Sequence, residues 1–79
     1  MRVMNILIVE DEKSLANALF AKCVQVGLNP SLAPDGEAGL EAALKEKPDL
    51  ILLDMLMPRM NGVDFMREIR KDPWGRVFL

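Results

Sequence analysis

Acidic residues stand directly after two aliphatic runs, and they are the side chains of this sequence best suited to chemistry. The run at residues 6–9 leads into Glu10 and Asp11, and the run at residues 50–53 leads into Asp54. Carboxylate oxygens are the ligands that Mg²⁺ prefers, and a carboxylate beside bound Mg²⁺ can take up a phosphoryl group as an acyl phosphate. The pattern predicts a site for a divalent cation and phosphoryl transfer, provided that the fold brings these acids together.

Each group of acids also has a plainer interpretation. Asp11 and Glu12 precede a predicted helix, where negative charge stabilises the positive end of the helix dipole. Asp54, taken alone, fits an ordinary acid in a loop after a strand. The combination is more specific, because three carboxylates gathered in one cleft repel one another and a hard cation removes that repulsion.

The order of predicted elements brings the acids to one edge of a sheet. The two aliphatic runs fit buried strands, and a third, shorter strand contains Pro30, which favours an edge position. Helical spacing of apolar residues separates the strands, so the pattern is that of parallel βαβ units with right-handed crossovers, an α/β fold. The expected strands are residues 5–9, 29–33 and 49–53, and the expected helices are residues 13–26, 35–47 and 63–71.

Several residues should fix the ends and the inner faces of these elements. Gly27 suits the left-handed position after the first helix, and Asp35 can cap the second. Cys23 falls within an apolar row and is predicted to pack rather than react. In the third helix we expect an inward face formed by four apolar residues: Val63, Phe65, Met66 and Ile69.

Composition excludes several classes of protein. The net charge of −2 and pI of about 5.0 argue against a surface that binds nucleic acid directly. No apolar stretch approaches the roughly 20 residues of a membrane span, and no signal peptide is apparent. The single cysteine, Cys23, suits a reducing compartment, so a cytoplasmic location is expected.

The sequence resembles the receiver domain of two-component response regulators over nearly its whole length. This resemblance implies a partial flavodoxin-like fold, with parallel strands ordered 2-1-3, the start of a fourth strand, and helices on both faces of the sheet. The matching stretches are ILIVEDE at 6–12, DGEA at 35–38, PDLILLDMLMP at 48–58, NG at 61–62 and REIR at 67–70.

The resemblance also implies the roles of individual residues. Asp54 would accept a phosphoryl group from the phosphohistidine of a sensor histidine kinase, with Mg²⁺ as cofactor. Glu10 and Asp11 would hold the metal together with Asp54, and the main-chain carbonyl of Leu56 would add a further ligand. A shaping role in the loop beyond Asp54 falls to two more residues, Pro58 and Gly62. Such a module is a phosphoacceptor and not an enzyme.

The sequence matches only the first part of the family's pattern. Residues 77–79 would open the fourth strand, so residues 1–79 are expected to form a single truncated receiver domain without the hydroxyl and lysine that grip the phosphoryl group. Switching should be impaired, and the first helix should be poorly covered at Leu15, Leu19, Phe20 and Cys23. An exposed sheet edge favours a homodimer, a strand-exchanged dimer, or a larger protein of which these residues are a part.

Two other functions stay open at the level of the sequence. The first is a Mg²⁺-dependent phosphohydrolase with an aspartate nucleophile, although such enzymes usually carry a second acid where this chain has Leu56. The second is an interaction or structural fragment with no phosphoryl chemistry.

Overall fold

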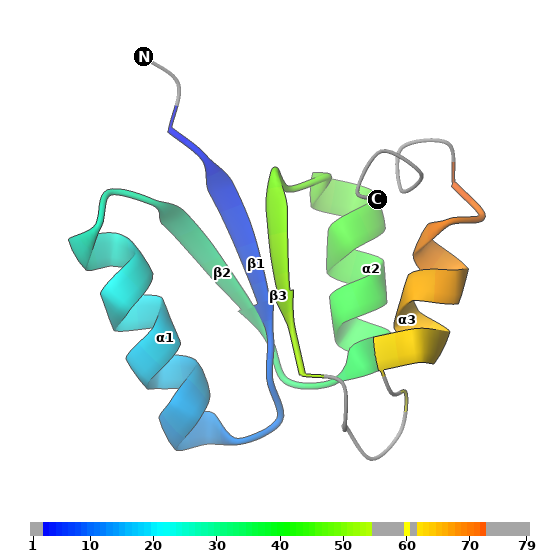
Figure 1. Cartoon of the computed structure of the whole chain (residues 1–79), viewed down its shortest axis with the longest axis horizontal. Coiled ribbons are helices and arrows are strands. Elements are labelled where there is room, and N and C mark those ends of the chain that lie inside the picture. The colour runs from blue at the N-terminus through cyan, green and yellow to red at the C-terminus, as the bar shows by residue number, and fades with distance from the viewer. Residues whose placement is uncertain (1–2, 55–59, 61, 73–79) are drawn as a thin grey trace.

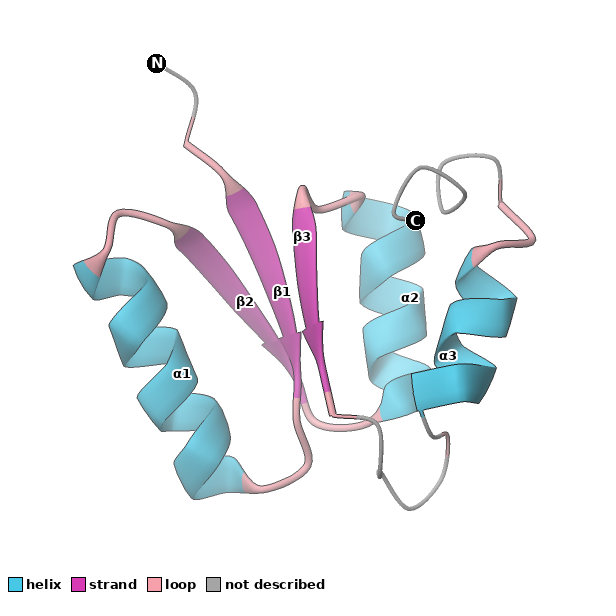
Figure 2. Ribbon diagram, in the orientation of Figure 1, coloured by secondary structure: helices cyan, strands magenta, loops and turns pink. Residues whose placement is uncertain are grey.

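A computed structural model describes residues 3–54, 60 and 62–72, in which strands and helices alternate (Figures 1 and 2). This alternation is the one that the sequence predicts. The predicted strand opening at residues 77–79 lies outside the described residues. The elements are β1 (Asn5–Val9), α1 (Lys13–Gln25), β2 (Asn29–Ala33), α2 (Gly36–Glu46), β3 (Leu50–Leu53) and α3 (Gly62–Ile69).

The three strands form a parallel sheet in the order β2-β1-β3. The central strand, β1, is the most buried, and its four aliphatic residues at 6–9 are at most 2% exposed. Such burial on both faces explains why the run carries no polar alternation. Pro30 lies in β2, which pairs only with β1 among the described strands, as expected for an edge strand. The predicted 2-1-3 order is confirmed.

The two faces of the sheet are covered differently. Figures 1 and 2 show α1 on one face and both α2 and α3 on the other. Side chains alternate along β1, so Ile6 and Ile8 pack with Cys23 while the other two aliphatic residues join the α2–α3 side. The larger cluster of buried residues comprises Leu7, Val9, Ala33, Ala43, Phe65 and Ile69.

Helix α2 approaches β1 closely because it presents a glycine at the contact. A Cβ atom on Gly39 would lie 2.7 Å from Val9 Cγ2 and 3.3 Å from Phe65 Cε2. Neither neighbour can move freely, since both are buried in the same cluster. The absence of a side chain at Gly39 therefore sets the spacing between α2 and the sheet.

The predicted roles of Asp35 and Gly27 at helix ends are confirmed, whereas α3 begins at Gly62 and ends at Ile69 instead of spanning the predicted residues 63–71. The side chain of Asp35 caps α2, and its Oδ1 accepts a hydrogen bond of 2.8 Å from the Ala38 N–H. Gly27 has a φ of 88°, the left-handed conformation that stops α1. Lys47 adopts the same region with a φ of 49° after α2, immediately before Pro48.

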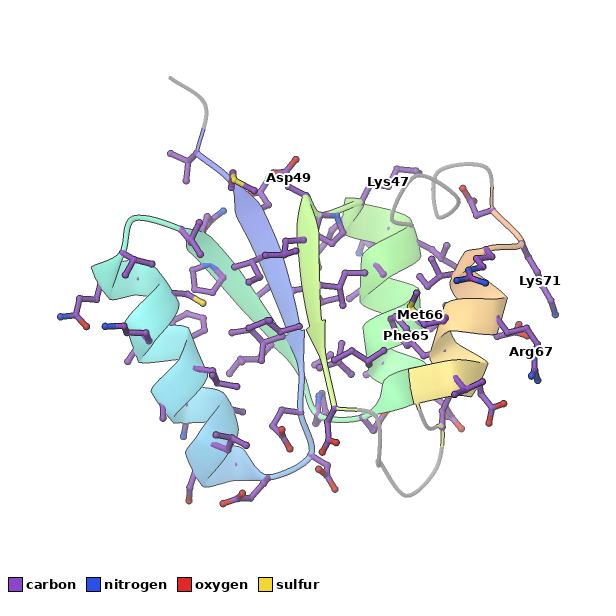
Figure 3. All side chains as sticks on the ribbon, in the orientation of Figure 1. Lys47, Asp49, Phe65, Met66, Arg67 and Lys71 are labelled. Atoms are coloured by element: carbon purple, nitrogen blue, oxygen red, sulfur yellow. The ribbon has the colours of Figure 1, made fainter. Side chains whose placement is uncertain are left out.

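Two expectations about packing require correction. Val63 is 56% exposed, whereas Phe65 and Ile69 are buried against α2. Figure 3 shows Phe65 and Met66 on the side of α3 that faces α2, with Arg67 and Lys71 pointing away. Residues 65 and 69 form one row along the helix, and residue 63 lies about 200° around the axis from residue 65, so it cannot share that row.

Cover over α1 is also uneven. Leu15 is 43% and Phe20 36% exposed, as expected for a helix with little above it, and Leu19 is half-buried. Cys23 is only 6% exposed, so its predicted poor cover is wrong, because the thiol packs against the sheet beside Ile6 and Ile8. Its assignment as a packing residue is confirmed.

None of the helices in the described part of the chain is both long enough and apolar enough to cross a membrane.

The contrast between Phe65 and Val63 yields a stability prediction. Phe65→Ala should lower the free energy of unfolding by about 3–5 kcal/mol, because a buried ring is lost and a cavity remains. Val63→Ala, on the exposed side of the same helix, should change it by no more than about 0.5 kcal/mol. Urea unfolding measures both values. If Phe65→Ala does not fold, Ile69→Val should still cost about 0.5–1.5 kcal/mol, and equal costs at residues 63 and 69 would contradict the packing.

Candidate metal and phosphoryl site

Backbone hydrogen bonds bring the carboxyl ends of β1 and β3 together. Val9 and Leu53 are direct partners in the parallel register, so the residues that follow them leave the sheet side by side. The Asp54 N–H donates to the Val9 carbonyl at 3.2 Å, and the Glu10 N–H donates to the Ala33 carbonyl at 3.1 Å. These bonds continue the strand pairing by one residue beyond the strands, and they fix the backbone positions of Glu10 and Asp54.

Three acids predicted from the sequence therefore meet at this edge of the sheet. Glu10, Asp11 and Asp54 each offer a carboxylate oxygen, and these oxygens all lie within 4.8 Å of one another. Glu10 is buried at 8% exposure, Asp54 is half-buried and Asp11 is exposed. The cluster is thus buried at Glu10 and open to solvent at Asp11.

A main-chain hydrogen bond orients the buried carboxylate. The Glu12 N–H donates to Glu10 Oε2 at 3.0 Å, across the turn that leads into α1. Glu12 is the N-cap of α1 by its backbone, but its side chain makes no capping bond. The turn between β1 and α1 therefore holds the Glu10 carboxylate in place, whereas the Glu12 side chain is not part of the acid cluster.

Opposing influences act on the pKa of Glu10. The largest is the hydrogen bond from the Glu12 N–H, which lowers the pKa because it favours the charged form. Burial, a side-chain hydrogen bond with Asp11, and the negative charges of Asp54 and Asp11 act in the opposite direction. Together they prevail, and the pKa of Glu10 lies above its ordinary value. Burial and the neighbouring acids thus favour the protonated form of Glu10.

This donor set fits a hard divalent cation. Carboxylate oxygens from two strand ends, one of them exposed, can bind Mg²⁺ and leave room for water and a phosphate oxygen. A cation would also relieve the repulsion that raises the pKa of Glu10. The chemistry of these side chains is thus compatible with the metal that the sequence predicts.

The other predicted site residues are only partly described. Leu56 and Pro58 lie outside the described residues. Gly62 is the first residue of α3 and is buried. A Cβ atom on Gly36 would lie 2.6 Å from Met60 Cβ, so the start of α2 closely abuts the segment that follows the site.

An apolar groove, not anticipated as part of the site, opens from the acid cluster. It has a volume of about 370 Å³, and its lining includes Leu15, Leu19 and Leu52 together with Glu10 and Asp54. The sequence predicts that apolar residues of α1 are poorly buried, and hence that apolar surface is exposed there. Only the three-dimensional structure shows that this surface is continuous with the acids.

Known proteins match both the sequence and the fold. The response regulator ArlR of Staphylococcus haemolyticus is 40% identical over 68 residues, which are 86% of this chain and 31% of that protein. The N-terminal domain of a response regulator receiver protein from Methanoculleus marisnigri superposes with a TM-score of 0.88 at 33% identity, covering 96% of this chain and 62% of that one. This chain thus spans about a third of the curated relative.

A third similar protein carries a metal. The receiver domain of the sensor histidine kinase PA1611 from Pseudomonas aeruginosa has a magnesium ion coordinated in its active site cleft. It superposes with a TM-score of 0.88 at 31% identity, covering 95% of this chain and 62% of that one. The family described as the response regulator receiver domain matches residues 6–79, and the chain belongs to that family.

Proposed function

We propose that Asp54 is the phosphoacceptor of this receiver domain and that it takes its phosphoryl group from the phosphohistidine of a sensor histidine kinase. The observation that carries the proposal is the convergence of three carboxylate oxygens within 4.8 Å at the carboxyl ends of two parallel strands. Ligands of open α/β sheets bind at this edge. Such a role places the chain in the cytoplasm, where its single cysteine would stay reduced.

The proposed metal is Mg²⁺, held by Glu10, Asp11 and Asp54. The main-chain carbonyl of Leu56, outside the described residues, is the further ligand that family resemblance assigns. When bound, the ion neutralises part of the charge that would otherwise repel an incoming phosphoryl group. Support comes from the all-oxygen donor set, the raised pKa of Glu10 and the magnesium in the similar receiver domain of PA1611.

The transfer step itself needs little from the protein beyond position. An oxygen of the Asp54 carboxylate attacks the phosphorus, a P–O bond forms, and the P–N bond to the donor imidazole breaks. The imidazole leaves with the electron pair of that bond and takes a proton from water. The backbone bond from Asp54 to the Val9 carbonyl holds the start of the nucleophilic residue against the sheet, and the Glu12 N–H keeps Glu10 turned toward the cluster.

Pro58 and Gly62 are proposed to shape the loop beyond Asp54. Gly62 supports this role through its burial at the start of α3.

A small phosphodonor can test the acceptor. Incubation with acetyl phosphate and Mg²⁺ should add one phosphoryl group to the chain, detected by intact mass, and acetate leaves. Asp54→Asn should abolish the adduct because an amide is not a nucleophile for phosphorus. The matched control is Asp64→Asn on α3, where the carboxylate pairs with Arg67 at 3.3 Å and is not part of the acid cluster.

Three outcomes distinguish the alternatives. An adduct that depends on Asp54 supports the acceptor. Continuous release of phosphate without an adduct would instead favour a phosphohydrolase. An adduct that survives Asp54→Asn would overturn the proposal.

The raised pKa of Glu10 predicts how stability depends on pH in the absence of metal. The folded chain binds this proton more tightly than the unfolded chain, so the free energy of unfolding should fall as pH rises from the ordinary pKa of a glutamate through the raised one. Glu10→Gln removes this loss, because an amide keeps an acceptor for the Glu12 N–H but carries no charge. The free energy of unfolding of Glu10→Gln should therefore increase relative to that of the wild-type chain as pH rises.

Urea unfolding at several pH values, with and without Mg²⁺, measures this effect. Added Mg²⁺ should stabilise the wild-type chain more than Glu10→Gln, since binding to the folded state alone raises stability. Glu12→Gln provides the control, as it removes a neighbouring charge outside the cluster. Parallel pH profiles for wild type and Glu10→Gln would show that Glu10 does not titrate in this way.

We also infer that the 79-residue chain by itself is phosphorylated slowly and switches poorly. The hydroxyl and lysine that the family resemblance assigns to later strands are not among these residues. Removing a single positioned donor for developing charge typically costs about 10²–10³ in rate. At the same concentration of acetyl phosphate, the receiver domain from M. marisnigri should be phosphorylated at least about tenfold faster than the 79-residue chain. Equal rates, with equally extensive changes in amide NMR shifts on phosphorylation, would contradict this inference.

A further inference from the structure

The turn from β2 into α2 is attached to the acid cluster at one end and to Met60 at the other. At its first end, the Ala33 carbonyl accepts the hydrogen bond of 3.1 Å from the Glu10 N–H. At its second end, a Cβ atom on Gly36 would lie 2.6 Å from Met60 Cβ and 2.8 Å from the Met60 carbonyl oxygen. Real Cβ atoms do not come this close to other atoms, so the contact exists because residue 36 has no side chain.

Other interactions hold the parts of the fold that surround this contact. The Asp35 side chain caps α2 by accepting a hydrogen bond of 2.8 Å from the Ala38 N–H. Three residues beyond Gly36, the glycine at position 39 lies so near the sheet that a Cβ atom there would be 2.7 Å from the Val9 side chain. Met60 packs against the larger buried cluster. A methyl group at position 36 would therefore displace Met60 or push the turn away from it.

We propose that Gly36 is a positioning residue of the metal and phosphoryl site. A displaced turn would carry the Ala33 carbonyl away from the Glu10 N–H, and a displaced Met60 would move the far end of the connection that begins at Asp54. Either movement alters the spacing of carboxylate oxygens that lie within 4.8 Å of one another. The inference rests on the proposed function in taking Mg²⁺ as the ion that these acids hold.

The expected effect of a substitution is on metal affinity. Residues that orient metal ligands without touching the metal typically contribute about 10–100-fold to affinity or activity. Gly36→Ala should therefore raise the Kd for Mg²⁺ by about tenfold or more, and it should slow phosphorylation of Asp54 by acetyl phosphate by a similar factor. Isothermal titration calorimetry measures the Kd without any phosphoryl transfer.

Ile69→Val is the matched control for a general loss of stability. Ile69 is buried in the larger cluster, but it lines a pocket with Leu50, at the amino end of β3, whereas Asp54 follows the carboxyl end. This variant should lower the midpoint of thermal unfolding and change the Kd for Mg²⁺ by less than about twofold, as expected for separate sites.

A double-mutant cycle with Met60→Gly tests the contact itself. Met60→Gly removes the nearest atom and gives the backbone the freedom to turn its carbonyl aside. In that background, Gly36→Ala should raise the Kd for Mg²⁺ by less than about threefold, because residues in contact have non-additive effects. Circular dichroism checks that each variant is folded. If Gly36→Ala unfolds in buffer, all the variants are compared in sucrose, which stabilises folded chains.

The outcomes separate this inference from the proposed function. A folded wild-type chain that does not bind Mg²⁺ would refute the proposed metal site, and this inference with it. Mg²⁺ binding that Gly36→Ala weakens no more than Ile69→Val does would overturn this inference alone. An equal loss of affinity with and without Met60→Gly would do the same, as would a Gly36→Ala chain that stays unfolded even in sucrose, since the glycine would then serve folding.

Discussion

Mutual repulsion among carboxylates is the constraint around which this small fold is built. Parallel pairing of β1 with β3 places Val9 beside Leu53, so Glu10 and Asp54 must leave the sheet as neighbours. The pairing is stabilised by apolar burial along β1 and by backbone hydrogen bonds that continue past both strands. The same interactions that stabilise the sheet therefore concentrate negative charge at its edge. Burial raises the pKa of Glu10, and the neighbouring charges of Asp54 and Asp11 raise it further.

The side of the sheet opposite α1 supplies the rigidity that such a site requires. Phe65 is fully buried, and the glycine at position 39 lets α2 settle directly onto Val9 and the Phe65 ring. Gly36 does the same for α2 and Met60, so the elements that flank the site are packed without spare space. Because a close-packed cluster yields little, the strand ends that carry Glu10 and Asp54 stay side by side. A proton on Glu10 or a bound cation would each lower the repulsion among the carboxylates.

The sequence predicts most of this fold because its strongest signals are local. Aliphatic runs identify β1 and β3, and Asp35 identifies the start of α2 by a hydrogen bond within one turn. The expected burial on both faces holds for β1 but is wrong for β3, where Leu50 and Leu52 are 42% and 37% exposed. The acids are predictable for the same reason, since each follows its strand directly. The inward face of α3 was misassigned at Val63 because the phase of a helix depends on which neighbour it packs against. Burial of Cys23 likewise depends on how α1 crosses the sheet, which no local pattern records.

The unequal cover of the two faces links the site to its surroundings. The acid cluster lies at the end of an apolar groove, so whatever covers Leu15 and Leu52 also excludes water from the neighbourhood of Glu10 and Asp54. Excluding water lowers the local dielectric and strengthens every charge interaction in the cluster. A covering surface that brings a cation is then favoured, whereas one that is purely apolar raises the cost of keeping the carboxylates charged. Occupancy of the groove and charge at the site are therefore coupled through electrostatics, without any movement of the sheet.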